Sequence, residues 1–220
     1  MSSVNALSWK YTAQENGLYG VNTPFEAMIN VRPSVVAARK YFYDREDLVI
    51  AEIGVMKGDH ARYLYRVMIP KKMYLIDCWE PIDRREKGED YRDCDAYYKC
   101  TVERFGDKSN VEIIKGRSWE VMPTFEENSF DFIYIDGDHY SEACSKDILN
   151  GLRLVKLGGI LAGHDYGSKS GLPVDNGFIG VAGALFAVFE GMSINGETGD
   201  WWVIVDEEKK RLVETKKEML

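Results

Sequence analysis

The sequence predicts an α/β fold built on a doubly wound, mostly parallel sheet that carries helices on both faces. Short apolar runs rich in β-branched and aromatic residues alternate along the chain with stretches of helical periodicity. This alternation favours a parallel sheet covered on both sides. Acidic residues and glycines follow directly after several of the runs. Because such sheets bind ligands beyond the carboxyl ends of their strands, near the switch in strand order, we expect the site there.

The elements follow one another without repeats or low-complexity linkers. The apolar runs predict strands over residues 48–55, 73–79, 111–114, 130–135, 160–163 and 201–205. The periodic stretches predict helices over residues 58–69, 90–105, 119–125, 141–155 and 178–189. The pair Gly158-Gly159 is typical of a helix stop, and the charged last dozen residues predict a frayed end or a surface helix.

The first part of the chain is polar and aromatic. A capping-box pattern that starts at Thr23 predicts a helix to about Tyr43, which Pro33 can divide into two pieces. We expect residues 1–45 to form an arm and helix that act as a substrate lid. Residues 46–220 are then the ligand-binding domain.

Charge and cysteine usage exclude several classes of function. The chain has 220 residues and a net charge of −8, so it lacks a general attraction to phosphate backbones or anionic lipid. We therefore expect a small-molecule substrate, with neither nucleic acid nor membrane as partner. No signal peptide or long apolar run is evident. The cysteines show no C-x-x-C spacing and predict reduced thiols in a cytoplasmic protein; they are Cys78, Cys94, Cys100 and Cys144.

The first predicted strand runs into the pattern E-x-G-x-x-x-G, which begins at Glu52 and includes Gly54 and Gly58. Glycine permits a sharp turn and a close approach of a ligand or strand. A carboxylate at Glu52 would repel a pyrophosphate but would favour a cationic sulfonium ligand with an ammonium group. Asp77 ends the second strand, where an acidic residue can accept both hydroxyls of a ribose. Taken alone, a tight turn without a ligand and a capping aspartate remain alternatives.

The third predicted strand leads into a polar turn. In this architecture the turn lies beside the adenine of a nucleoside ligand. Ser118 can hydrogen-bond the base and Trp119 can pack on it, although a core position fits Trp119 equally well.

Acidic residues and histidines follow the fourth and fifth predicted strands. Asp136, Asp138 and His139 come after one strand, and His164 and Asp165 come after the next. Neighbouring parallel strands would bring them together, which is costly without a compensating cation. Carboxylate-rich sets suit Mg²⁺, Mn²⁺ or Ca²⁺. In the plainer interpretation, Asp138 caps a helix and His139 is an exposed loop residue, while His60 on the first helix is structural or faces solvent.

The motifs E-I-G-V-x-x-G, L-I-D, F-I-Y-I-D-G-D-H-Y and G-G-I-L-A-G-H-D-Y resemble the class I S-adenosylmethionine-dependent methyltransferases. Within that class they are most similar to small-molecule O-methyltransferases whose fourth strand ends in D-G-D-H. The resemblance covers roughly residues 48–205. It implies a Rossmann-like, seven-stranded sheet and S-adenosylmethionine as cofactor, held by residues that include Glu52, Gly54, Gly58, Asp77, Ser118, Trp119 and Asp136.

The resemblance also implies a divalent ion on Asp136 and Asp165, with His164 as third ligand. An acidic or amide residue is usual where His164 stands, so the histidine shifts the preference towards Mn²⁺, Fe²⁺ or Zn²⁺, or removes the metal. In the similar families a general base follows the metal aspartate by two or three residues, which matches Asp138 and His139. An unperturbed pKa of about 6.5 favours His139 as this base, with Asp138 orienting it.

Two other functions stay open, and the sequence argues against a third. An iron-dependent hydroxylase similar to the cephalosporin hydroxylases would share the acidic strand ends, and His164 is compatible with it. A non-catalytic S-adenosylmethionine-binding module is the second. A nicotinamide dehydrogenase is disfavoured by Glu52 and by the lack of a G-x-G turn. The methyl acceptor and any homo-oligomeric state are not encoded in a readable pattern.

Overall fold

The computed structural model describes residues 32–80, 93–166, 178–197 and 199–220. The chain divides into two units, Met1–Val31 and Arg32–Leu220, and all of the described residues belong to the second. The helix start predicted at Thr23 lies outside the described residues. The same is true of most of the predicted lid, whose role stays a prediction.

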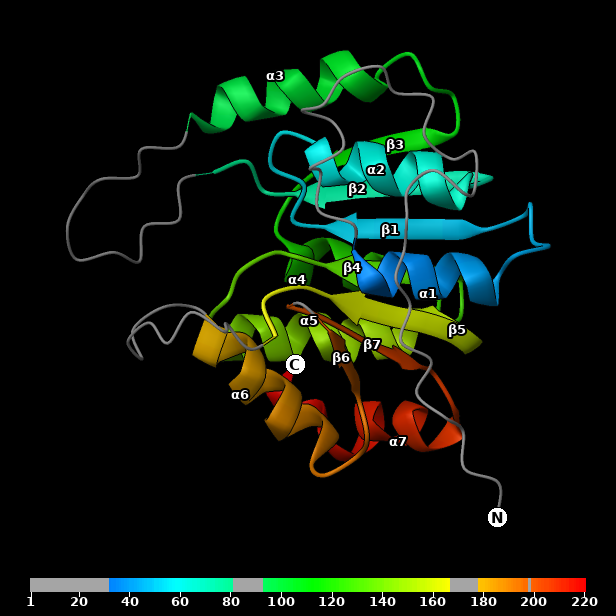
Figure 1. Ribbon diagram of the computed structural model, residues 1–220. Coiled ribbons are helices and arrows are strands. Elements are labelled where there is room, and N and C mark those ends of the chain that lie inside the picture. The colour runs from blue at the N-terminus through cyan, green and yellow to red at the C-terminus, as the bar shows by residue number, and fades with distance from the viewer. Residues whose placement is uncertain (1–31, 81–92, 167–177, 198) are drawn as a thin grey trace. The chain divides into compact units, whose positions relative to one another are not determined.

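A seven-stranded sheet organises this unit, in the order β3-β2-β1-β4-β5-β7-β6 (Figure 1). The first five strands in this order are parallel, and β7 and β6 add to β5 in antiparallel orientation. The strand order reverses between β1 and β4, so the expected switch point lies there. The strands are β1 Val49–Ile53, β2 Lys72–Asp77, β3 Val111–Lys115, β4 Phe130–Ile135, β5 Val155–Gly163, β6 Asn195–Glu197 and β7 Asp200–Ile204.

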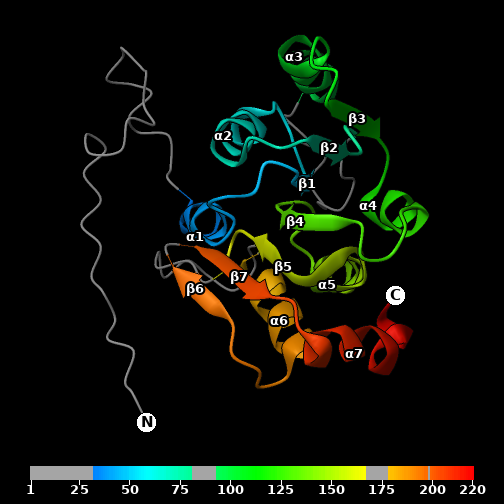
Figure 2. The same ribbon diagram turned by 90° about the vertical axis from the view of Figure 1, so that its right-hand side faces the viewer.

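Helices cover both faces of the sheet, which confirms the predicted fold class (Figure 2). One face carries α1 Pro33–Tyr41, α2 Asp59–Met68 and α3 Cys94–Phe105. The other carries α4 Ser118–Val121, α5 Ser141–Leu154, α6 Phe178–Phe189 and α7 Glu207–Thr215. Short 3₁₀ turns follow α4 at Met122–Thr124 and α7 at Lys217–Met219. Each layer has its own apolar core, because alternate strand residues point to opposite faces.

The end of α5 is the clearest difference from the sequence-based prediction. The helix stops at Leu154 and β5 begins at Val155, so the predicted stop at Gly158-Gly159 lies inside a strand. Gly158 adopts a φ of +77°, at the irregular register between β4 and β5. A Cβ on Gly159 would lie 2.9 Å from the carbonyl oxygen of Asp131. The two glycines therefore permit a kinked, closely packed strand rather than a helix end.

Two smaller features have simple causes. Pro33 begins α1, where a proline removes no intrahelical hydrogen bond, and the helical piece predicted before it lies outside the described residues. Strand β6 was not predicted, since its sequence Asn-Gly-Glu is short, polar and exposed. Across the described segments, no helix combines the length and apolar character that a membrane span requires.

Candidate functional site

The loop after β1 packs directly on the end of β4, at the switch point of the sheet. Gly54 has a φ of +83°, and a Cβ at this position would lie 2.1 Å from the carbonyl oxygen of Asp136. The amide of Asp136 donates to the Ile53 carbonyl at 2.7 Å, and the Gly54 amide donates to Ile76 at 2.9 Å. Only glycine fits this contact, and the contact joins the first motif to the fourth-strand cluster.

Asp77 holds this loop through backbone amides. Its Oδ2 accepts the amides of Val55 and Met56 at 2.8 and 2.9 Å, and its Oδ1 accepts the amide of Trp79 at 2.8 Å. Met56 stands in the left-handed region with a φ of +53°. The Asp77 carboxylate, which the sequence predicts to bind a ribose, thus holds the loop in its shape in this structure.

The outer side of the same loop is held as well. The Met56 carbonyl accepts hydrogen bonds from Trp79 Nε1 at 2.8 Å and from Thr101 Oγ1 at 3.0 Å. A Cβ on Gly58 would lie 3.1 Å from the ring of Phe105, so this glycine makes room for a core aromatic residue. With its backbone tied on two sides, the loop has a fixed geometry, and the side chain of Met56 is half exposed.

Glu52 lies beneath the loop, and its partner is His60. The glutamate is 1% exposed, and its Oε1 lies 3.2 Å from His60 Nδ1. Burial raises the pKa of Glu52. Its Oε2 and the His60 Nε2 have no hydrogen-bond partner in the described part of the chain. His60 is therefore a partly buried neighbour of the motif, with its ring centroid 4.3 Å from that of Tyr134.

The turn after β3 meets a buried acid. Ser118 is the first residue of α4, and the partly buried Trp119 follows it with the Arg117 guanidinium 5.5 Å from its ring centroid. Asp147 of α5 is fully buried, and burial raises its pKa to about 7, a shift that the Ser118 hydroxyl moderates. Neither Asp147 oxygen has a well-aligned hydrogen bond to a described residue, so this carboxyl group lacks compensation.

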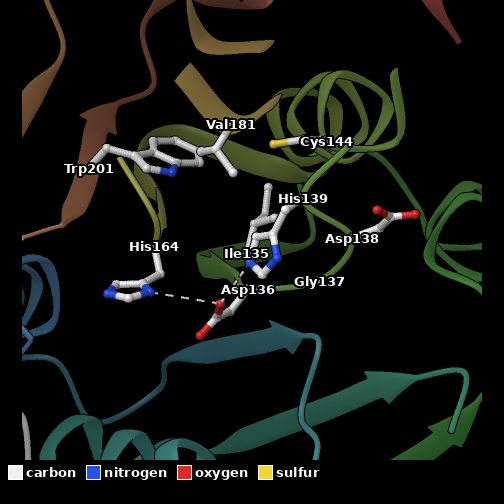
Figure 3. A pocket seen from close by; sticks show the side chains of 9 residues that line it. All are labelled: Ile135, Asp136, Gly137, Asp138, His139, Cys144, His164, Val181 and Trp201. Atoms are coloured by element: carbon white, nitrogen blue, oxygen red, sulfur yellow. Dashed lines mark ion pairs between the residues drawn. The ribbon is translucent and has the colours of Figure 1, made fainter. Parts of the chain in front are cut away.

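Asp136, His139, His164 and Asp165 form one cluster at the ends of β4 and β5. His139 Nε2 lies 2.5 Å from Asp165 Oδ2 and 3.7 Å from Asp136 Oδ1. His164 Nδ1 lies 3.0 Å from Asp165 Oδ1 and 4.0 Å from Asp136 Oδ1, the contact that Figure 3 marks. The structure therefore brings together the three predicted metal ligands and the predicted base.

The charges in this cluster compensate one another. The carboxylates of Asp136 and Asp165 raise the pKa of His139 to about 10. Burial alone would raise the pKa of Asp165, but its contacts with His139 and His164 outweigh burial and hold it well below the usual range. Asp165 also has a φ of +61°, a conformation that costs a non-glycine residue about 1–3 kcal/mol and that is frequent at functional sites.

The donor set fits a divalent cation. One ligand atom each from Asp136, His139 and Asp165 lies within 4.8 Å of the others. His164 contacts two members of this group, so two imidazoles face two carboxylates. Mixed nitrogen and oxygen ligands suit Mn²⁺, Fe²⁺ or Zn²⁺ better than Mg²⁺. His139, assigned from the sequence as a base, thus lies within reach of the same position.

Asp138, the other candidate base, lies apart from the cluster. Its side chain points away from Asp136 in Figure 3, and its Oδ1 accepts the backbone amide of Tyr140 at 3.0 Å. This contact forms a turn directly before α5 and does not cap the helix, because the N-cap residue is Tyr140 and no side chain caps it. Of the two candidate bases, His139 is the one within reach of the cluster.

Two further charged residues, absent from the sequence-based set, reach the site. Arg32 lies 3.5 Å from Asp200 and 3.9 Å from Asp136. Asp200 is fully buried at the start of β7, where it accepts the Ser34 hydroxyl at 2.6 Å and the Tyr134 hydroxyl at 3.0 Å. In the sequence, Asp200 could have been identified as an acidic residue directly before an apolar run.

Comparisons with known proteins address the fold and the family. A solved structure of cofactor-bound Rv0187 from MTB is 17% identical, with a TM-score of 0.57, and the match covers 82% of this chain and 83% of that one. A "putative caffeoyl-CoA O-methyltransferase" from Staphylococcus aureus is 16% identical, with a TM-score of 0.54 and coverages of 82% and 91%. Spermidine synthase from Thermotoga maritima is 16% identical, with a TM-score of 0.50 and coverages of 83% and 63%.

At these identities the matches show the fold alone. The chain spans 42%, 53% and 40% of the length of three other matched methyltransferase structures. Among curated proteins, none matches this sequence. A family model described as a methyltransferase domain matches residues 51–166, which is 116 of 220 residues and includes the loop after β1 and the whole cluster. The chain therefore belongs to this methyltransferase-domain family.

Proposed function

We propose that the protein transfers a methyl group from S-adenosylmethionine to a hydroxyl of a small molecule, with the assistance of a divalent cation. One observation carries the proposal. The backbone of the loop after β1 touches the backbone of Asp136, so a donor site and a charged acceptor site share one edge of the sheet. Methyl transfer requires this arrangement, because donor carbon and acceptor oxygen must be held in line at short range.

On the donor side, Asp77 and the loop it braces are assigned to the ribose and methionine part of the donor. The buried Oε2 of Glu52 has no partner among the described residues, which supports a role towards the ammonium or sulfonium charge. Ser118 and Trp119 are assigned to the adenine. The turn that carries them follows β3, which pairs with β2, so it lies next to the strand end that carries Asp77. Solved structures with this fold include cofactor-bound Rv0187, which supports a cofactor here.

On the acceptor side, Asp136, His164 and Asp165 would hold the cation, and His139 reaches the same position. A bound cation would lower the pKa of the acceptor hydroxyl and orient its oxygen. The net charge of −8 supports a small molecule as acceptor rather than a nucleic acid or a membrane surface.

His139 is assigned as the general base. Methyl transfer breaks the bond from sulfur to the methyl carbon and forms a bond from that carbon to the acceptor oxygen, and the hydroxyl proton passes to His139. With a pKa of about 10, this histidine is protonated at neutral pH while its positive charge balances the two carboxylates. Compensation of Asp136 and Asp165 by a cation would lower that pKa and leave His139 neutral, as a base must be.

The experiment is a transfer assay with methyl-labelled S-adenosylmethionine against a panel of sugars, catechols and natural-product alcohols. We expect label in an acceptor ether when Mn²⁺ is present and at least a tenfold loss of rate in His139→Ala. The matched control is Asp138→Ala, which alters a side chain outside the cluster. Label transfer that persists after exhaustive chelation would reject the metal, and tighter binding of NAD than of the methyl donor would reject the cofactor.

An iron-dependent hydroxylase is the second candidate, and one observation favours it. Two histidines and two carboxylates in one cluster also satisfy the two-histidine, one-carboxylate pattern of non-haem Fe²⁺ oxygenases. The two functions differ in product and requirement. Methyl transfer proceeds without dioxygen and adds a methyl group, whereas hydroxylation needs dioxygen and adds an oxygen atom, so product mass under anaerobic conditions separates them.

A further inference from the structure

A small, partly open cavity lies beside the cluster. Its volume is about 10 Å³, which is close to the minimum that holds one water molecule. It is lined by residues of β4, β7, α5 and α6 and of the loops after β4 and β5 (Figure 3). The lining comprises Ile135, Asp136, Gly137, Asp138, His139, Cys144, His164, Val181 and Trp201.

Trp201 contributes an unpaired donor to this cavity. The residue is fully buried, and its Nε1 has no hydrogen-bond acceptor within the described segments. In Figure 3 the indole nitrogen is turned towards the side of the cavity where His139 and His164 lie. An indole N–H can only donate, and leaving it buried and unpaired costs about 1–3 kcal/mol. The cavity therefore needs an occupant that accepts a hydrogen bond.

The position of the indole ring is fixed by the backbone. Trp201 of β7 pairs with Gly163 of β5. A Cβ at Gly163 would lie 2.6 Å from Cζ2 and 2.7 Å from Cε2 of the ring, so only glycine permits this contact. Gly163 directly precedes His164 and Asp165 in the chain. The indole ring therefore packs against the end of β5, directly before His164 and Asp165 of the cluster.

The chemistry of the lining selects the occupant. A cation on Asp136, His164 and Asp165 cannot accept a hydrogen bond from Trp201, so the acceptor is a separate group, and the small volume beside the indole favours one the size of a water molecule. A water molecule can accept from Trp201 and donate to a carboxylate, and buried waters make two to four such bonds. His139 Nε2 faces the same space and has no well-aligned hydrogen bond to a described residue, although it pairs with Asp165.

We propose that Trp201 holds one water molecule in this cavity, bridged to the Asp136–His139 wall, and that Trp201 is thereby a positioning residue for His139. The catalytic consequence rests on the proposed methyl transfer, whereas the water site itself does not. Trp201 also lies beyond the residues 51–166 that the family model matches. The donor to the water therefore comes from outside the matched segment, whereas Asp136 and His139 lie within it.

The water site is tested by NMR on protein labelled with ¹⁵N at the indoles. The chain has five tryptophans and therefore five indole signals. The single variants Trp201→Phe and Trp202→Phe each remove one signal and so assign two of the five. Trp202 is the matched control, since it neighbours Trp201 and packs into the core on the opposite face of the sheet. We expect a cross-peak between the Trp201 indole proton and a long-lived water. An indole signal coupled to a protein acceptor, or one that contacts no water, overturns the proposal.

The positioning role is tested by kinetics once an acceptor is known. Trp201→Phe deletes the N–H donor and keeps a smaller aromatic ring, and Trp202→Phe controls for the change in ring size, so we expect kcat to fall about tenfold in Trp201→Phe, the effect of roughly one hydrogen bond. KM and the Kd for S-adenosylhomocysteine should stay within about twofold, as in Trp202→Phe. Equal kcat in both variants overturns the positioning role. If Trp201→Phe does not fold, the Trp201 indole signal is assigned by replacing the other four tryptophans one at a time. The water measurement on the wild-type protein then decides whether the water site exists.

Discussion

The two halves of the site differ in how their polar groups are satisfied. On the donor side, Asp77 uses both oxygens on three backbone amides, and the Met56 carbonyl accepts two side-chain donors. On the acceptor side, Asp136 and Asp165 face two histidines at 2.5 to 4.0 Å, and the Trp201 indole has no described partner. The backbone of the donor-side loop is thus satisfied by the protein itself, with the buried Glu52 Oε2 as an unpaired atom among the described residues, whereas the acceptor side is held by compensating charges.

The difference indicates two ways to prepare a ligand site. A braced loop costs little to bind a ligand, because its backbone is already ordered. A cluster of imperfectly paired carboxylates and imidazoles gains most when a cation or a substrate replaces these pairs. We therefore expect substitutions on the donor side to affect folding and donor binding together. Substitutions on the acceptor side should affect metal binding and turnover.

The contact between the two halves should give the largest effect on stability. Gly54→Ala places a methyl group against the Asp136 carbonyl at a φ of +83°. We expect a loss of about 3–5 kcal/mol, the sum of overpacking and left-handed strain. Gly191→Ala is the control, because Gly191 has a φ of +86° with nothing within 4 Å. Denaturant unfolding should give about 1–2 kcal/mol for Gly191→Ala, and equal losses would show that the contact is not tight.

Asp147 should produce the next effect, and it depends on pH. Its pKa is raised from 3.8 to about 7 in the folded protein. Since a raised pKa stabilises the folded state only while the group is protonated, this contribution is lost as pH rises from about 4 to 7. Asp147→Asn removes this dependence and should gain up to about 4 kcal/mol relative to wild type above pH 7. A constant difference between the two proteins from pH 4 to pH 8 would contradict the buried, uncompensated carboxyl group.

Trp79 should give the smallest effect. Trp79→Phe deletes the hydrogen bond from the indole to the Met56 carbonyl and keeps the packing against Tyr98. Because Thr101 still holds that carbonyl, we expect a loss of about 1 kcal/mol in stability and a few-fold weaker binding of S-adenosylhomocysteine. Calorimetry checks both. A loss above about 3 kcal/mol would mean that the loop depends on this one bond.

The fold and the members of the cluster could be predicted because both depend on local patterns. Alternating strands and helices determine a parallel sheet, and parallel strands place their ends at one edge. Asp136 and Asp165 follow directly after β4 and β5, so their proximity required only the strand order. Glu52, Gly54 and Asp77 lie next to the same switch point for the same reason.

The remaining parts depend on packing that a single sequence does not encode. Alternation in Trp201-Trp202 predicts that one ring points inward on each face, but not that Gly163 lies under one of them. Arg32 reaches Asp136 because buried Asp200 anchors it from a strand late in the chain. The unpaired state of Asp147 follows from how α5 packs behind Gly137, which helical periodicity leaves open.

The central claim is that one half of the site binds the methyl donor and the other half binds the metal. A calorimetric comparison of Asp77→Asn with Asp165→Asn tests this claim most directly. We expect Asp77→Asn to weaken S-adenosylhomocysteine binding about 10- to 150-fold, since charge-assisted bonds worth about 1.5–3 kcal/mol are lost, and to leave Mn²⁺ binding unchanged. Asp165→Asn should weaken Mn²⁺ binding at least tenfold and leave S-adenosylhomocysteine within about twofold of wild type. If both variants lose both ligands in equal measure, or if neither ligand binds the wild-type protein, the account is wrong.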